Sequence, residues 1–444
     1  METVGQPGKK RVTAAEALRG HTVVLTLLVF LAVAGFVAAS WGPLSRHSLL
    51  DLDVYRSGGA TWLAGHSLYD HLLPALKLHL PFTYPPFSAI LMSPLALVSM
   101  PVAAMAITLM SMVALTVTGF QVCRTVALEA GDGWVPQLKP RLLSAVLLLI
   151  AIDVSLLLEP VASTLSHGQI NVLLLAMVIA DATCTPRWKG RGILVGLAAA
   201  IKLTPAIFIL YFLLRRDYRA AMTSIAAFVL FGLIGFALAS QDSIAYWTHT
   251  LFNTGRIGYT ASASNQSITG ALARLGFDGS SAKLAWIGLS LIAVVLAITA
   301  AKKALSSGRN LLALICVALC GLLVSPISWS HHWVWVLPAV YVLATMGFRE
   351  RKLWPSLLSL LGFFIAAAQP EWWLPNGAYH ELEWTWWQHI IGNAYVLWAF
   401  LTLGLVAVKV PRGGWHQSSP RTGVSSRDGW SDPSVAVGST PVRR

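Results

Sequence analysis

The sequence predicts an all-α polytopic membrane protein with about 10–12 membrane helices. Of its 444 residues, 56% are hydrophobic and only 11% are charged, which leaves too little polar surface for a soluble chain of this size. Apolar blocks of about the length that crosses a bilayer follow one another along the chain. Short basic clusters separate these blocks, as Lys and Arg do in cytoplasmic loops.

The first apolar block is predicted to be a retained membrane span. Lys9, Lys10, Arg11 and Arg19 precede an almost unbroken apolar stretch over 23–41. This stretch is longer than the apolar core of a signal peptide, and further apolar blocks follow it. Residues 1–21 are therefore expected to form a cytoplasmic N-terminal segment, and the chain leaves the membrane on the opposite side.

The basic clusters then give each later block a direction across the membrane. With most of the 32 Lys and Arg on the cytoplasmic side, the outside keeps only a few. These few are Arg46, Arg56, Lys77, Arg256, Arg274 and Lys283. The outward spans are predicted at 22–41, 142–158, 219–239, 310–326 and 353–368, and the inward spans at 170–184, 284–301, 333–347 and 388–408.

Two blocks depart from simple crossing. Residues 87–123 are too long for one helix and contain Pro94 and Pro101, which favours a short partial helix followed by one full span. Residues 192–214 have basic clusters at both ends and a break from Lys202 to Pro205. Two short helices that enter the membrane and return are expected there, with the turn shielded by protein or facing a wet cavity.

The whole of 22–410 is predicted to be one membrane domain with external loops. Residues 411–444 are rich in Ser, Gly, Pro and Arg and are expected to form a disordered cytoplasmic tail. The net charge of +13 does not indicate nucleic-acid binding, because the basic residues mark the loops and do not gather on one face among aromatic residues.

The external loops contain the polar residues that suggest chemistry. They are short, so their side chains are expected to line one cleft near the outer headgroups. The candidates in these loops are Asp51, Asp53, Tyr84, His167, Gln169, Arg256, Asn265, His331 and His332. Tryptophans near 329–335 and 372–387 indicate an interfacial aromatic belt more strongly than a ligand-stacking role.

Asp51 and Asp53 are the candidates for a general base. Both follow the first span in a region otherwise poor in acids. If a short helix begins there, two positions point to different faces, so only one carboxylate can face the cleft. The alternative for Asp51 is a helix N-cap.

Six motifs, in order, resemble glycosyltransferase family 87. The resemblance spans most of residues 20–410. Residues 381–393 also resemble the mycobacterial members of that family that act on phosphatidylinositol mannosides. The motifs are Asp51-Leu-Asp-Val-Tyr55, Gly65-His-Ser-Leu-Tyr-Asp70, Phe82-Thr-Tyr-Pro-Pro-Phe87, His167-Gly-Gln-Ile-Asn171, Gly196-Leu-Ala-Ala-Ala-Ile-Lys-Leu-Thr-Pro205 and Ser328-Trp-Ser-His-His-Trp333.

The resemblance implies a GT-C type fold and an inverting mannosyltransferase in the plasma (inner) membrane, with its active site facing the periplasm. It implies polyprenyl phosphate mannose as the donor, a phosphatidylinositol mannoside as the acceptor and an α-1,2 linkage in the product. Membrane lipids surround such an enzyme.

The family motif keeps its first acid, which favours Asp51 as the base over Asp53. His331 and His332 are expected to donate to phosphate or to orient the acceptor. The residues expected to bind the donor phosphate or the substrates are Arg256, Tyr84, His167, Gln169, Asn265 and Lys202.

No metal or other cofactor is expected. Asp51 and Asp53 have the spacing of a carboxylate pair that holds a cation over a diphosphate, but a lipid monophosphate has less charge to neutralise and no further ligand cluster supports a cage. The four cysteines are expected to be reduced packing residues.

The alternative function is a transporter or flippase of lipid-linked sugars, because Lys202 within an apolar block is typical of a substrate pathway. A non-catalytic scaffold would leave the acids and histidines unexplained.

Overall fold

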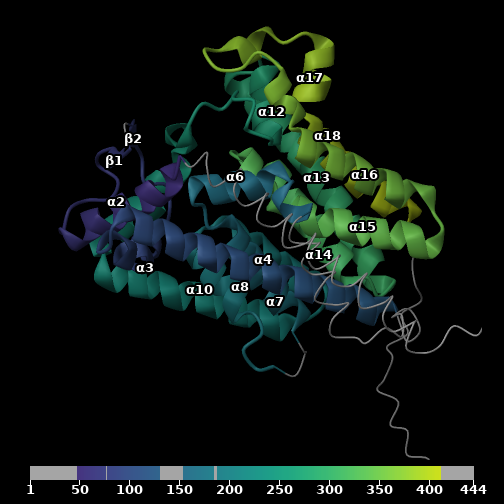
Figure 1. The fold of residues 1–444 in the computed structure, drawn as a ribbon, viewed down its shortest axis with the longest axis horizontal. Helices are drawn as coiled ribbons and strands as arrows, with labels where there is room; N and C mark the ends of the chain where they lie inside the picture. The colour runs from purple at the N-terminus through teal and green to yellow at the C-terminus, as the bar shows by residue number, and fades with distance from the viewer. Residues whose placement is uncertain (1–47, 77, 131–153, 185–187, 412–444) are drawn as a thin grey trace, which may run out of the picture.

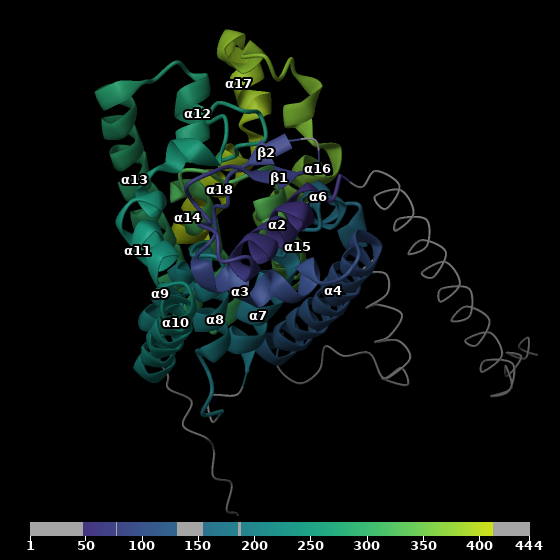
Figure 2. The same cartoon turned by 90° about the vertical axis from the view of Figure 1, so that its left-hand side faces the viewer.

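The computed structural model describes residues 48–76, 78–130, 154–184 and 188–411, and these form a bundle of helices with short connections (Figures 1 and 2). The N-terminal half contains α2 (Leu50–Leu63), β1 (Leu73–Ala75), β2 (Leu78–Leu80), α3 (Pro86–Ala96), α4 (Met100–Ala130), α6 (Glu159–His167), α7 (Asn171–Thr183), α8 (Ile193–Ile201), η1 (Thr204–Ile207), α9 (Phe208–Leu214) and α10 (Tyr218–Leu238). The C-terminal half contains α11 (Ser240–Thr248), η2 (Thr250–Phe252), η3 (Thr254–Ile257), α12 (Ile268–Arg274), α13 (Gly279–Ser306), α14 (Asn310–Val324), η4 (Ser330–Trp335), α15 (Val336–Glu350), α16 (Leu353–Ala368), η5 (Pro370–Trp373), η6 (His380–Glu383), α17 (Trp386–Gly392) and α18 (Ala394–Lys409).

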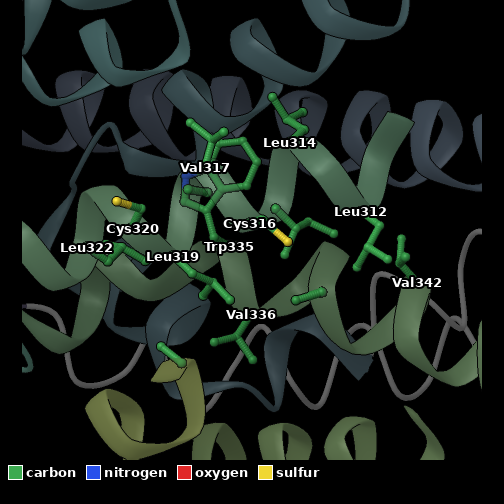
Figure 3. Close-up of a cluster of buried hydrophobic side chains, with 14 of the residues drawn as sticks. Leu312, Leu314, Cys316, Val317, Leu319, Cys320, Leu322, Trp335, Val336 and Val342 are labelled. Atoms are coloured by element: carbon green, nitrogen blue, oxygen red, sulfur yellow. The ribbon is translucent and has the colours of Figure 1, made fainter. Parts of the chain in front are cut away.

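The larger hydrophobic core is built around α14. Nearly every side chain of this helix is buried, because it is apolar on all sides and other helices cover it. Figure 3 shows its side chains beside Trp335, Val336 and Val342 of η4 and α15. Cys316 and Cys320 are free and buried in this core, which confirms the expected packing role for this pair.

The smaller core fixes the position of α2. Leu52 and Tyr55 of α2 are fully buried against α3, the hairpin and α8. The backbone amide of Leu49, just before α2, donates to the carbonyl of Ser166 at the end of α6 (3.0 Å). The start of α2 is therefore held against the end of α6, although more than a hundred residues separate them in the sequence.

The two irregular blocks have the predicted form. Residues 87–123 comprise the short α3 and the long α4, with a break between Ala96 and Met100. Residues 192–214 comprise α8 and α9, which are joined by the 3₁₀ turn η1. Arg191 Nε lies 3.4 Å from Asp217 Oδ2, so the two ends of this block meet, as expected for a segment that enters and returns.

An acid holds the beginning of α8. The carboxylate of Asp181 accepts hydrogen bonds from the amides of Gly192 (2.7 Å) and Val195 (2.9 Å). At Gly196 an added Cβ would lie 2.4 Å from the carbonyl oxygen of Ser224, so glycine permits the close approach of α8 to α10. These contacts fix the segment that ends at Lys202.

The helical prediction is confirmed, with two corrections. Strands β1 (Leu73–Ala75) and β2 (Leu78–Leu80) pair as a two-stranded antiparallel hairpin in which Leu73 pairs with Leu80, so the chain is not purely α. The predicted inward span 388–408 is also bent by 72° between α17 and α18. The bend lies at Asn393, whose side-chain amide donates to the carbonyl of His389 (2.8 Å).

By length and composition, three helices in the described part of the chain can cross a membrane. These are α4, α10 and α13, and the number rises to five if the bent pairs α6–α7 and α17–α18 each count as one span. Because α14 and α16 are shorter than a full span, the predicted number of about ten full spans stays a prediction. The predicted segments 1–21 and 22–41, the predicted tail 411–444 apart from Pro411, and most of 142–158 lie outside the described residues.

Candidate active site

A cavity of about 400 Å³ lies at the break between α8 and α9. The first turn of α2, the loop before α3, η1, the end of α14 and the start of η4 form its walls. Five of the predicted site residues line it together, although they come from distant parts of the sequence. These are Asp51, Tyr84, Gln169, Lys202 and His332.

The two acids of α2 diverge, as the helical spacing predicts. Asp51 lines the cavity, whereas Asp53 Oδ2 accepts a hydrogen bond from the amide of Leu76 (2.7 Å), and its Oδ1 lies 3.7 Å from Arg56. Asp53 therefore holds the hairpin. The N-cap of α2 is Leu49, with no side-chain capping bond, so the N-cap alternative for Asp51 is wrong.

A hydrogen-bonded group of neutral side chains surrounds Asp51. The hydroxyl of Tyr55 donates to Gln169 Oε1 (2.7 Å), and Gln169 Nε2 donates to the hydroxyl of Tyr84 (3.2 Å). The rings of Tyr55 and Tyr84 meet edge to face at 5.2 Å. Because these groups hold one another, Gln169 has a fixed orientation beside the carboxylate.

Burial raises the pKa of Asp51 above its ordinary value of 3.8, although His167, Lys202 and Gln169 act in the opposite direction. A carboxylate with a raised pKa is a stronger base than an ordinary aspartate. The neighbouring cation Lys202 favours the ionised form of Asp51 and acts against the effect of burial.

Lys202 provides the cation of the cavity. Its ammonium donates to Asn171 Oδ1 (2.9 Å) and lies 3.2 Å from His332 Nε2. Because an ammonium group can only donate, the Nε2 atom of His332 accepts, and the Nδ1 atom of the neutral ring carries the proton. Burial, reinforced by Lys202, lowers the pKa of His332 well below 6.5 and keeps the ring neutral.

The two adjacent histidines have different surroundings. His331 does not line the cavity; its ring packs 5.4 Å from the ring of His167 and 4.9 Å from that of His332. Its Nε2 is buried without a hydrogen-bond partner among the described residues. Its carbonyl accepts from Thr164 (3.0 Å) and Asn171 (2.9 Å), which fixes η4.

Three other predicted residues lie outside the cavity lining. His167 is close enough to Asp51 to act against the rise in its pKa, and its Nδ1 lies 2.8 Å from the carbonyl oxygen of Ser163. Asn265 is fully buried, and its Oδ1 accepts from the amide of Ser328 (2.9 Å), so it joins two loops. Arg256 lines a neighbouring cavity.

Sequence reasoning assigned no site role to Trp329 or Asn171. Trp329 lines the cavity, and an added Cβ at Gly258 would lie 2.9 Å from its ring, so the indole is closely held. Asn171 connects Lys202 to His331. Both stand in the quoted motifs, Ser328–Trp333 and His167–Asn171, and their position there was the available signal.

No group of three or more His, Cys, Asp or Glu side chains with metal-binding geometry occurs in the described ranges 48–76, 78–130, 154–184 and 188–411. The expectation that no metal is needed stays a prediction.

The model of glycosyltransferase family 87 matches residues 82–326, which is more than half of the chain and includes Tyr84, Gln169 and Lys202. The chain belongs to glycosyltransferase family 87. Asp51 and His332 lie outside this match, but full-length relatives extend the similarity over most of the chain.

Two relatives are named polyprenol-phosphate-mannose-dependent alpha-(1-2)-phosphatidylinositol mannoside mannosyltransferase. The protein from Mycobacterium tuberculosis H37Rv is 41% identical over 88% of this chain and 92% of its own length. The protein from Mycolicibacterium smegmatis is 40% identical over 90% and 93%.

A third relative, from Mycobacterium tuberculosis CDC 1551, is named for a phosphatidylinositol pentamannoside acceptor and is 33% identical over 90% of each chain. No solved structure gave a significant match. The family assignment therefore rests on sequence, and the cavity geometry is independent of it.

Proposed function

We propose that this protein is an inverting α-1,2-mannosyltransferase that moves mannose from polyprenyl phosphate mannose to a phosphatidylinositol mannoside. The printed names of the two relatives at 40–41% identity supply the donor, the acceptor class and the linkage. The observation that carries the proposal is one cavity in which an acid, Asp51, faces the same space as the ammonium of Lys202 and the neutral imidazole of His332.

The proposed step is a single displacement at the anomeric carbon. Asp51 accepts the proton of the acceptor hydroxyl while its oxygen bonds to this carbon. The bond from the carbon to the phosphate oxygen breaks on the opposite face, and the phosphate departs with the electron pair. A β-linked donor then gives an α-linked product.

Lys202 and His332 are proposed to receive the developing phosphate charge. The ammonium of Lys202 has one donor on Asn171 and one on His332, which leaves a third for an oxyanion. The Nδ1–H of His332 is a second donor. Fixed donors aimed at charge that develops in the transition state are among the largest contributions to enzymatic rates.

We further propose a GT-C type fold in the inner membrane, with the cavity facing the periplasm. The assignment of most Lys and Arg residues to the cytoplasmic loops supports this orientation. A variant without the four native cysteines and with Ser280→Cys should be labelled from outside the cell by an impermeant thiol reagent, whereas Arg219→Cys should not. The reverse pattern would place the cavity on the cytoplasmic side.

The function is tested with purified protein in detergent, radiolabelled polyprenyl phosphate mannose and a phosphatidylinositol mannoside. The expected result is a radiolabelled product with one additional α-1,2-linked mannose. Asp51→Asn should lower its rate of formation by about two to four orders of magnitude. Asp53→Asn should retain it, because an amide oxygen can still accept from Leu76. A flippase would move the donor in vesicles without consuming it.

A further inference from the structure

A second cavity lies directly behind one wall of the reaction cavity. The wall is the segment 250–257, which contains η2 and η3. Every third side chain along this segment faces the same side, as in a 3₁₀ helix. Leu251, Thr254 and Ile257 line the reaction cavity, whereas Thr250, Asn253 and Arg256 line a second cavity of about 300 Å³.

The opposite wall of this second cavity is the turn that follows α2. Tyr69, Asp70, His71 and Leu72 line it, together with His249 from the end of α11. The hydroxyl of Tyr69 donates to the carbonyl of Tyr84 (2.7 Å), whose side chain lines the reaction cavity. The two cavities are therefore connected through fixed contacts as well as through the shared wall.

Arg256 is the distinctive residue of the second cavity. Its guanidinium lies 5.7 Å above the ring of Tyr69, a cation–π contact. Within the described part of the chain, neither a hydrogen bond nor an ion pair engages this guanidinium, whereas Arg56 and Arg274 both donate to backbone carbonyls. A partly buried guanidinium with free donors in a cavity favours an anionic ligand, and its planar fork fits a phosphate.

The other lining groups suit hydroxyls next to that anion. Asp70, Asn253 and Thr250 offer acceptors and donors for a polyol ring, and His71 and His249 add further donors. Leu72 lines the cavity with 53% of its surface exposed, and Phe252 beside Asn253 is 74% exposed. Such exposed apolar groups suit the boundary between a polar headgroup and acyl chains.

We propose that this cavity binds the phosphodiester and polyol of the acceptor glycolipid, with Arg256 on the phosphate. This inference rests on the proposed function. During transfer the phosphate of the donor must lie beside Lys202 and His332 in the reaction cavity, on the other side of the wall. The acceptor phosphate is separated from the reacting hydroxyl by the mannose chain, so it needs a separate binding place.

The test compares two acceptors of equal mannose number, a phosphatidylinositol mannoside and a neutral alkyl mannoside without phosphate. For Arg256→Gln, the KM of the charged acceptor should rise about tenfold to a hundredfold, the range of losing one charge-assisted contact. The kcat, the KM of the donor and all constants for the neutral acceptor should match wild type. Arg256→Lys should give an intermediate KM.

Lys283→Gln is the matched control, because Lys283 is an exposed cation that the topology also places outside. It should leave the KM of both acceptors unchanged. Three results for Arg256→Gln would each overturn the inference, provided that wild type transfers mannose. They are an equal rise in the KM of the neutral acceptor, a raised KM of the donor, and an unchanged KM of the charged acceptor. If wild type transfers no mannose, the proposed function itself fails, and this inference with it.

Discussion

The protein has two clusters of buried polar and charged side chains, and only one of them lines a cavity that a substrate could enter. The site cluster of Asp51, Lys202 and His332 faces a cavity of about 400 Å³. The sealed cluster contains Glu159, Arg274, Glu371, Glu381 and Asn393, all of them buried, and none of them lines that cavity. In the site cluster the polar groups keep free donors and acceptors for a substrate.

In the sealed cluster, Arg274 and Glu159 make hydrogen bonds within the fold, whereas both carboxylate oxygens of Glu371 are buried without a partner among the described residues. Arg274 donates to the carbonyls of Ser262 (2.6 Å) and Asn265 (3.0 Å) and to Asn393 Oδ1 (2.6 Å). Glu159 accepts from the hydroxyl of Ser330 (2.8 Å), the residue before His331. Charge burial alone therefore does not identify a reactive group; a substrate-sized space beside the charge is also needed.

The comparison is tested most strongly by removing one acid from each cluster. Asp51→Asn should lower the transfer rate by about two to four orders of magnitude, because the amide keeps the shape but cannot accept the proton. Glu371→Gln should leave the rate within about threefold of wild type, since the chemistry does not use it. Steady-state turnover under saturating donor measures both, and a Glu371→Gln variant as slow as Asp51→Asn would break the distinction.

A comparable contrast is expected for the cations. Lys202→Met should lower kcat by about two to three orders of magnitude while the protein still folds, because a donor aimed at the phosphate is lost. Arg274→Met should instead reduce the yield of folded protein, because it leaves three backbone and side-chain acceptors without their donor. Folded yield by size-exclusion chromatography and kcat together separate the outcomes.

The adjacent histidines test the same distinction within one turn. His332→Ala should reduce turnover by about ten- to a hundredfold, whereas His331→Ala should mainly lower the thermal midpoint, because only His332 lines the cavity. The turnover of the double variant should be about one to three orders of magnitude below that of wild type. A His332→Ala variant with normal turnover would remove that residue from the site.

The pH dependence of turnover depends on Asp51. The base must be ionised, and burial raises its pKa above 3.8. As the solution is acidified, kcat should therefore begin to decline at a higher pH than it would with an ordinary aspartate. The same burial disfavours the ionised form in the folded state, so Asp51→Asn should not lower the thermal midpoint at neutral pH. An acid limb centred at or below pH 3.8 would contradict the assignment.

The smallest expected effect concerns stability and Glu371. Burial, with Glu159 nearby, raises the pKa of Glu371 to about 8 from 4.5. The folded state therefore binds one proton more than the unfolded state between these values, so this stabilising contribution is full below pH 4.5 and lost by pH 8. The thermal midpoint of wild type should fall by a few degrees over this window, on the order expected for one linked group, and Glu371→Gln should flatten the decline.

Sequence periodicity predicted the helices well where apolar length decides them. The proline break between α3 and α4 and the Lys202 break between α8 and α9 lie where the sequence placed them. The hairpin of β1 and β2 was missed because three-residue strands carry too little alternation of apolar and polar residues to be recognised.

The site was predictable in its chemistry and less so in its contacts. The motifs indicated Asp51, Lys202 and His332, but residue type alone did not separate His332 from His331 or place Arg256 behind a wall. Which neighbour faces a cavity depends on the phase of a short 3₁₀ turn, and that phase is set by tertiary packing. Glu371 and Arg274 carried no sequence signal that distinguished them from catalytic groups.

The three-residue period of the wall at 250–257 has a consequence for loop length. Inserting one residue between His249 and Thr250 would rotate the segment by about 120°, one third of a 3₁₀ turn. Arg256 would then leave the second cavity for the face that lines the reaction cavity, and Gly255 would take its place. One residue added to or removed from this loop would therefore change which acceptor the protein uses, without substituting any residue of the reaction cavity.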